Sequence, residues 1–465
     1  MSAPLLWIIL PAALAIAAMP IRNQRILAIA GGSLAVLLAL IALIIPIDQA
    51  LQVGNFSFKI APAIQILGRR LVLVPADGSL LAIFYGLIAM WFFGSEVTDT
   101  ARRVVPYGLI IAALLVASIA VEPFLYAAIL IEIAVLLAVP LLLPPEQKPG
   151  PGVMRFLIYQ TLGMPFILFA GWLLAGVEAS PGDLALAVQS ATILGLGFAF
   201  LLALFPLYTW LPMLAEEVSP YVLGFLFWVL PTITIIFGMG FLDRYSWLRT
   251  SAQLSQILSL GGLIMVVTGG LWSAFQRHLS RQMAYAVIAE TGYSLLALSL
   301  TPEKSVETVF LLIIPRSLAL LVWAMSLTRL KEQVEPLRFS TVQGMARSYP
   351  ITVAGLVLAH LSVAGFPLLA GFPIRLALWE GLAGQSLSVA FWFLVGILGL
   401  LTGAIRTLAV LVMAPDGTGW EVQERWGSGI MIGLGSIGLF ILGIFPQTFR
   451  FVLANLPSMF EHLGK

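Results

Sequence analysis

The chain has 465 residues, of which 60% are hydrophobic and only 10% charged, a composition that excludes an ordinary soluble domain and indicates an integral membrane protein. A formal net charge of +2, without a basic run, argues against nucleic acid as a partner. The lack of cysteine and the presence of only three histidines exclude disulfides, iron–sulfur clusters, thiolate zinc sites and bis-histidine haem, so we expect no metal and no cofactor.

Apolar runs long enough to span a bilayer as helices, about 20 residues each, recur from one end of the chain to the other. Their cores lie near 4–19, 26–46, 78–95, 105–121, 123–143, 155–176, 188–206, 219–241, 257–275, 283–300, 306–328, 350–372, 385–412 and 429–447. The sequence therefore predicts an all-α polytopic membrane protein with about 14 transmembrane helices. No basic segment precedes the first run, so we expect a retained helix and not a cleaved signal.

The segments between these runs are short and rich in turn residues. PPEQKPGPG (144–152) and APDGTG (414–419) are breaker sequences, and the long polar stretch near 48–77 has room for a short hairpin. Lysine and arginine are more frequent on the loops opposite the termini, about 13 against about 9. The positive-inside rule then predicts that both termini lie outside the cytoplasm.

Among the ionisable residues inside or near the apolar runs, where a charge costs at least about 2.5–3.5 kcal/mol at a helix centre, five are candidates for an ion path. Glu132 has no partner close to it in the sequence, which favours a place on an ion path. Glu290 lies nearer a loop, and Arg316 is either a structural ion-pair partner of one glutamate or part of the path. His360, alone on an apolar helix, is typical of a hydrogen-bonded packing residue, and Arg375 follows the second interruption described next.

Two apolar runs are interrupted by proline and glycine. LFPLYTWLPMLAEEVSP (204–220) contains Pro206, Trp210 and Pro212, and the segment 360–381 contains Gly365, Pro367, Gly371 and Pro373. A pair of broken helices in comparable positions of two halves indicates an inverted-repeat transporter, because such backbone is tolerated only in protein or beside a hydrated cavity. We divide the chain into helices 1–3 (1–104), a first repeat (105–245), a second repeat (246–412) and a last helix with a tail (413–465). We also expect the pair Glu216–Glu217 to be hydrated beside the ion route.

These segments carry a family resemblance. FPLYTWLPMLAEEVSP (205–220) resembles the FPLHxWLPxAHxxAP signature of the antiporter-like subunits of respiratory complex I. With Tyr208 in place of histidine, it is still more similar to subunits of the Mrp-type cation/proton antiporters. Four more segments resemble motifs of the same family and occur in the family's order. They are PADGSLLAIFYGL (75–87), RHLSRQMAYAVIAETGYSLLAL (277–298), LSVAGFPLLAGFPIRLAL (361–378) and LGIFPQTF (442–449).

The resemblance implies a central chain of charged residues that moves protons. Glu132 matches the family's fifth-helix glutamate, whereas Leu201 and Ile233 fall where the seventh and eighth helices carry lysine. In the tenth-helix motif the family histidine becomes Glu290, and the lysines of the eleventh and twelfth helices become Arg316 and Arg375. Arginine effectively never deprotonates in proteins, so these exchanges keep shape or charge but not relay chemistry. Glu290 and His360 are the groups left to titrate between fixed arginines.

The resemblance implies an antiporter-like membrane subunit of a complex I-like or Mrp-like assembly that contributes to proton or cation translocation. Its partners would be other membrane subunits, lipid, and protons or monovalent cations, in a bacterial-type inner or plasma membrane or a thylakoid membrane. Two alternatives remain: a structural subunit that no longer conducts, and a stand-alone secondary transporter. No nucleophile–base pair or phosphate loop stands out, so any NAD(P)H:quinone oxidoreductase chemistry would lie in other chains.

Overall fold

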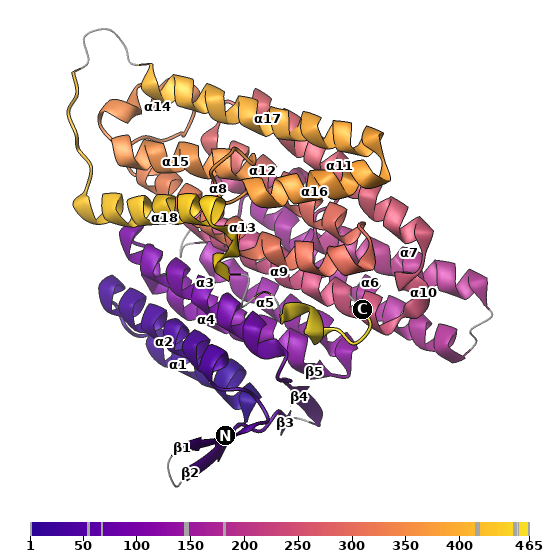
Figure 1. Cartoon of the computed structure of the whole chain (residues 1–465). Coiled ribbons are helices and arrows are strands. Elements are labelled where there is room, and N and C mark those ends of the chain that lie inside the picture. Colours follow the sequence, from indigo (N-terminus) through magenta and orange to yellow (C-terminus); the bar gives the residue numbers. More distant parts are fainter. Residues whose placement is uncertain are drawn as a thin grey trace.

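The computed structural model describes residues 2–53, 56–66, 68–143, 148–179, 183–413, 419–449, 453 and 455–463. These residues form a bundle of long helices that lie side by side, with α1 and α2 along one flank and α17 along the opposite one (Figure 1). In the described residues, eleven helices are long and apolar enough to cross a membrane. They are α2 (Gln24–Ile44), α3 (Asp77–Val97), α4 (Ala101–Ala120), α5 (Ala127–Leu142), α6 (Pro151–Ala179), α7 (Leu184–Leu201), α9 (Pro220–Arg244), α11 (Ala252–Phe275), α13 (Pro302–Lys331), α17 (Leu387–Val412) and α18 (Trp426–Ile444).

Shorter or more polar helices complete the bundle. They are α1 (Leu10–Ala18), which a π-helix at Leu5–Ile9 precedes, α8 (Trp210–Glu217), α10 (Ser246–Arg249), α12 (Leu279–Leu298), α14 (Phe339–Val342), α15 (Pro350–Val363) and α16 (Phe372–Gln385). The largely helical architecture expected from the apolar runs is therefore confirmed. Much of the two turn-rich segments, at 144–147 and 414–418, lies outside the described residues.

The polar stretch 48–77 is the main exception to the all-α architecture, and it forms antiparallel strand pairs where the sequence left room for a short hairpin. There β1 (Ala50–Val53) pairs antiparallel with β2 (Phe56–Lys59), and β3 (Ala63–Ile66) pairs with β4 (Arg69–Val72), which also pairs with β5 (Val121–Glu122). Gly68, between β3 and β4, has φ +74°, a conformation that glycine adopts without steric cost. Too polar to enter the bundle, this segment satisfies its backbone groups in small sheets at the end of the molecule where the N-terminus lies (Figure 1).

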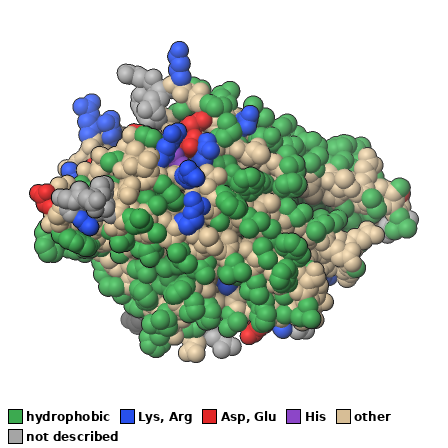
Figure 2. Space-filling view, turned by 90° about the horizontal axis from the view of Figure 1, so that it is seen from above, with side chains coloured by type: hydrophobic (Ala, Val, Ile, Leu, Met, Phe, Trp, Pro, Cys, Tyr) green, Lys and Arg blue, Asp and Glu red, His purple; other side chains and the backbone are tan. Residues whose placement is uncertain are grey.

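Charged side chains are unevenly distributed on the molecular surface. Figure 2 shows a dense group of them in the upper part of one face and a few near its lower edge, while the rest of that face is largely hydrophobic. Glu216 forms a partly exposed ion pair, in which its carboxylate lies 2.6 Å from Arg281 Nε and 4.0 Å from His278 Nε2. Burial lowers the pKa of His278, against the opposing effect of the Glu216 carboxylate. A surface that is largely hydrophobic, with its charged side chains gathered in limited areas, is typical of a bilayer-spanning protein.

Two apolar runs break where proline and glycine predict it. Helix α7 ends at Leu201 and α8 begins at Trp210, while α15 ends at Val363 and α16 begins at Phe372, so that residues 202–209 and 364–371 form two gaps of eight residues. Pro206 and Pro367 lie inside the gaps, and Pro212 and Pro373 occupy the first turns of the helices that follow. Proline suits a first turn because its missing N–H would have no intrahelical acceptor there.

The carboxylate pair beside the first break has a structural role, which corrects the expectation of a hydrated pair on an ion route. Glu217 accepts hydrogen bonds from the backbone N–H groups of Gly152 (2.7 Å) and Val153 (3.1 Å), at the first turn of α6. These amides have no intrahelical acceptors, and the helix dipole also favours a negative charge there. Glu217 therefore fastens α8 to the start of α6, while Glu216 forms its ion pair at the surface.

A second carboxylate ties a distant segment to the end of α9. Asp243 accepts hydrogen bonds from the backbone N–H groups of Glu461 (3.1 Å), His462 (2.7 Å) and Leu463 (2.8 Å). The same segment buries Phe460, whose ring stacks on Phe310 of α13 with 6.3 Å between centroids. Residues 455–463 are thereby held across the ends of helices from the middle of the chain.

Candidate functional site

A buried ion pair joins two helices in the second half of the chain. The Glu290 carboxylate on α12 accepts a hydrogen bond from the Arg375 guanidinium on α16, and the two side chains are only 2% and 5% exposed. The Arg375 guanidinium also lies over the Tyr293 ring, 3.8 Å from its centroid, in a cation–π contact. Tyr293 is one helical turn beyond Glu290, so a single face of α12 supplies both partners of Arg375.

Arg316 on α13 lies beside this pair and is also buried, at 3% exposure. It donates to the Phe227 carbonyl oxygen on α9 at 3.2 Å, and it lies 3.5 Å from the Thr291 hydroxyl, next to Glu290. The Phe227 carbonyl is available because Pro231, four residues later inside α9, has no N–H to donate to it. A proline inside a membrane helix has thus created an acceptor for a buried guanidinium.

The three charges do not cancel. Two guanidinium groups, which stay protonated, face one carboxylate, so the group of Glu290, Arg316 and Arg375 carries one net positive charge when Glu290 is ionised. Glu290 Oε2, Arg316 Nε and Arg375 Nε have no hydrogen-bond partner among the residues that the structure describes. Unpaired polar atoms at this depth indicate places for water or an ion.

Glu132 lies in the first half, on α5, and is 6% exposed. The Thr161 hydroxyl of α6 is its hydrogen-bond partner, while Glu132 Oε2 has none in the described ranges. Pro165 inside α6 leaves the Thr161 carbonyl without its intrahelical donor, in the same way as Pro231 does for Phe227. Within the described part of the chain, no hydrogen bond or ion pair joins Glu132 to the charges around Glu290.

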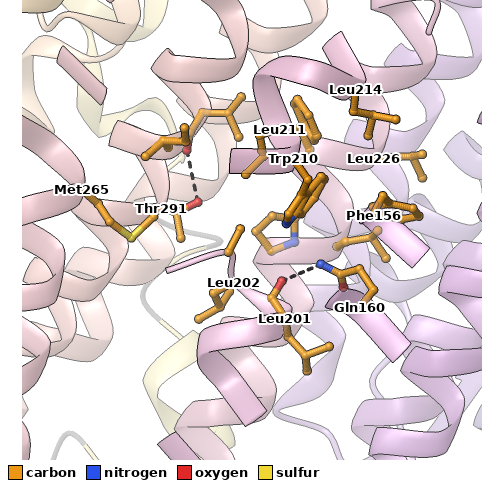
Figure 3. Close-up of a pocket in the computed structure, with 16 residues that line it drawn as sticks. Phe156, Gln160, Leu201, Leu202, Trp210, Leu211, Leu214, Leu226, Met265 and Thr291 are labelled. Carbon is orange, nitrogen blue, oxygen red and sulfur yellow. Dashed lines mark hydrogen bonds between the residues drawn. The ribbon is translucent and has the colours of Figure 1, made fainter. Parts of the chain in front are cut away.

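A cavity of about 30 Å³ is lined by residues that neighbour or contact members of both groups (Figure 3). Gln160, next to Thr161, lines one side and donates to the Leu201 carbonyl oxygen at 3.0 Å, while Thr291 and Phe227, the contacts of Arg316, line another. Trp210, the first residue after the break in α7, also lines it, and its indole Nε1 has no partner among the described residues. A cavity of this size holds one or two water molecules.

His360 lies apart from the charged group. On α15, fully buried, its ring stacks on Trp323 with 4.4 Å between centroids, and its Nε2 lies 3.5 Å from the Ser273 hydroxyl. Nearby, the Thr407 hydroxyl donates to the Gln282 side-chain oxygen at 2.9 Å. The packing interpretation of His360 fits these contacts, whereas its Nδ1 has no partner within the described residues.

The structure therefore brings together Glu290, Arg316 and Arg375, holds Glu132 against Thr161 without a described contact to that group, and leaves His360 separate. Sequence reasoning missed Tyr293, Gln160, Thr161, Thr291 and the Phe227 carbonyl. The helical spacing of Tyr293 from Glu290 and the proline inside "VLPTITII" were the signals that could have found two of them. In the described residues, no group of three or more His, Asp or Glu side chains could hold a metal ion.

Fold and site together define a multi-pass integral membrane protein with charged side chains buried inside its helical bundle. In membrane proteins such residues are candidates for an ion pathway. Residues 154–403, more than half of the chain, match the family described as NADH:quinone oxidoreductase/Mrp antiporter, transmembrane. The chain belongs to this family, which confirms the resemblance found in its motifs.

Curated relatives agree with this assignment. The chain is 24% identical over 318 residues to NADH-quinone oxidoreductase subunit N of Ectopseudomonas mendocina, a match that covers 63% of each chain. It is 26% identical over 303 residues to NAD(P)H-quinone oxidoreductase chain 4-3 of a Nostoc species, covering 61% of this chain and 53% of the relative. The matches thus span from about half to under two thirds of the length of these relatives.

Solved structures share the fold over nearly the whole chain. A chain of respiratory complex I from Thermus thermophilus superposes with a TM-score of 0.74 at 20% identity, covering 100% of this chain and 99% of that one. A chain of the Mrp complex from Dietzia sp. DQ12-45-1b gives a TM-score of 0.78 at 14% identity, covering 99% and 97%. At these identities the likeness establishes the fold.

Proposed function

We propose that this chain is an antiporter-like membrane subunit of a multisubunit complex, complex I-like or Mrp-like, and that it contributes to proton or cation translocation. Other membrane subunits would be its partners, as the complexes that contain its structural neighbours suggest. Family membership supports this proposal, and so does the burial of Glu132 and Glu290 inside the helical bundle.

The proposal includes a finer architecture. We count about 14 spans, with α7–α8 and α15–α16 as two discontinuous helices in two inverted repeats at 105–245 and 246–412. Helices 1–3 (1–104) and the last helix with its tail (413–465) would flank the repeats. Both termini would lie on the non-cytoplasmic side of a bacterial-type inner or plasma membrane or a thylakoid membrane.

The observation that carries this function is that polar groups from both halves of the chain line one small cavity. Gln160, the sequence neighbour of the Glu132 partner Thr161, lines the 30 Å³ cavity, and so does Thr291, a contact of Arg316. Water in the cavity would link the two halves, because hydrogen-bonded water bridges polar groups that are too far apart to touch. Each glutamate would take up or release a proton, or hold a cation, in its half of the chain.

Replacing Glu132 or Glu290 by glutamine is expected to lower ion flux through the assembled complex at least tenfold, since glutamine keeps the shape but cannot ionise. The measurement is proton and Na⁺ flux into vesicles that contain the whole complex. Glu122→Gln is the control, because this exposed glutamate lies in β5 and pairs only loosely with Arg70, at 3.9 Å. Full flux in both buried variants would reject a conducting role.

A second function, that of a structural subunit that does not conduct, is favoured by Leu201. This residue occupies the family's seventh-helix lysine position, and its side chain fills the space against Gly163 of α6, where even a Cβ would lie 2.6 Å from it. Ile233, at the eighth-helix position, is fully buried among apolar side chains. Hydrocarbon at both positions leaves the first half without the basic groups on which the family's relay depends.

The two functions differ in what Arg316→Gln does. If the chain is structural, this change is expected to reduce the amount of assembled complex several-fold and leave flux per assembled complex near normal, because the guanidinium then serves only to join α13 to α9. Native gels report assembly, and vesicle assays report flux. Normal assembly with lost flux would instead support conduction through this site.

A further inference from the structure

Arg316 separates two cavities. The Phe227 carbonyl and Thr291, to which it binds, line the 30 Å³ cavity, and Arg316 itself lines a second one of about 10 Å³. The second cavity lies about one helical turn further along α9 and α12, where Thr232 and Ser294 line it with apolar residues of α9 and α13. Its size limits a ligand to one water molecule or one monatomic ion.

The charge beside this cavity is uncompensated. Glu290 is already paired with Arg375, so the buried group keeps one net positive charge, and Arg316 Nε has no partner among the residues that the structure describes. Burying a charge without a counter-charge is costly, and arginine cannot escape the cost by losing its proton. A lysine at the same position could become neutral, so the need for a counter-ion is specific to arginine here.

We propose that the second cavity binds one small monovalent anion of about the size of chloride, held by Arg316. The Thr232 and Ser294 hydroxyls now donate to the carbonyls of Trp228 and Glu290, and they can rotate to donate to an anion instead. Larger anions such as bicarbonate, phosphate or sulfate exceed the space. The anion neutralises the charge that the arginine substitutions leave in the membrane, and this role is separate from proton or cation flux.

Equilibrium binding of radioactive chloride to the purified full chain in detergent tests the proposal, with non-radioactive bromide as competitor. Chloride is expected to bind at one saturable site, and Arg316→Gln to weaken it about tenfold or more, because a hydrogen bond to an ion is lost together with its charge. Glu290→Gln is expected to tighten binding, since it removes the neighbouring negative charge. Arg406→Gln, at an arginine that donates to the Ala274 carbonyl away from this cavity, should leave binding unchanged.

A matched pair of threonines guards against misfolding of the arginine variant. Thr232→Val keeps the side-chain shape but removes a hydroxyl from the cavity wall, and it is expected to weaken chloride binding several-fold. Thr234→Val removes an equally buried hydroxyl two residues away, which donates to Leu230 and does not line the cavity, and should have no effect. Absent chloride binding, or equal binding in the native chain and in Thr232→Val and Arg316→Gln, would show that water alone fills the cavity. Because binding is measured without transport, a failure here leaves the proposed ion flux untouched.

Discussion

Arg375→Ala is expected to lower the free energy of unfolding by about 3–5 kcal/mol, the cost of leaving one partner of a buried ion pair without the other. Glu290 is almost fully buried, and its second carboxylate oxygen has no partner in the described residues that could replace the guanidinium. The cation–π contact with Tyr293 is lost as well. This is the largest single effect that we expect from the charged group.

Unfolding of the detergent-solubilised chain by denaturant measures this cost. The double variant Glu290→Gln with Arg375→Met should recover a large part of the loss, because it removes both charges together. Arg70→Ala is the control: its ion pair with Glu122 spans 3.9 Å with side chains 64% and 49% exposed, and surface pairs contribute about 1 kcal/mol or less. If the double variant is as unstable as Arg375→Ala, the loss of stability does not come from leaving the Glu290 charge unpaired.

Gly371→Ala is expected to cost about 1–3 kcal/mol or more, because an added Cβ would overlap the Ser362 carbonyl oxygen across the second helix break. The backbone φ of Gly371 is −74°, so the effect comes from close approach and not from backbone strain. The two ends of the broken helix would have to move apart, which would also shift Arg375, one turn into α16.

Gly384 provides a matched control for this prediction on the same helix. A Cβ there meets no atom within 4 Å, so Gly384→Ala should gain up to about 1 kcal/mol from the higher helix propensity of alanine. The midpoint of thermal unfolding of both variants measures the contrast. Equal shifts in the same direction would show that the break tolerates separation of its ends.

Most of the helices could be predicted from the sequence, because a bilayer-spanning helix must be a long apolar run whatever its neighbours are. The breaks near Pro206 and near Gly365 were predictable for a similar reason, since proline and glycine act locally. The run predicted at 350–372 ends as a helix at Val363, where the first glycine of the break is two residues away.

The contacts between charges could not be predicted in this way. Glu290 and Arg375 are 85 residues apart, and only helix packing decides that they meet while His360 stays aside. The role of Glu217 was assigned wrongly because a carboxylate near a break also serves to cap a helix, and which amides it reaches depends on the fold. The acceptor for Arg316 is the backbone carbonyl of Phe227, which no side-chain pattern in the sequence reveals. The one clue is Pro231, which lacks the N–H that would otherwise bind this carbonyl.

The hydrogen bonds that Asp243 accepts from residues 461–463 have a consequence for the order in which the chain folds. The backbone N–H groups that donate to Asp243 belong to residues 218 to 220 positions later in the chain. The C-terminal end of α9 therefore lacks these hydrogen bonds while the second half of the chain is synthesised and inserted. The contact at Asp243 therefore forms late in biogenesis, after the intervening helices of the second half have been synthesised.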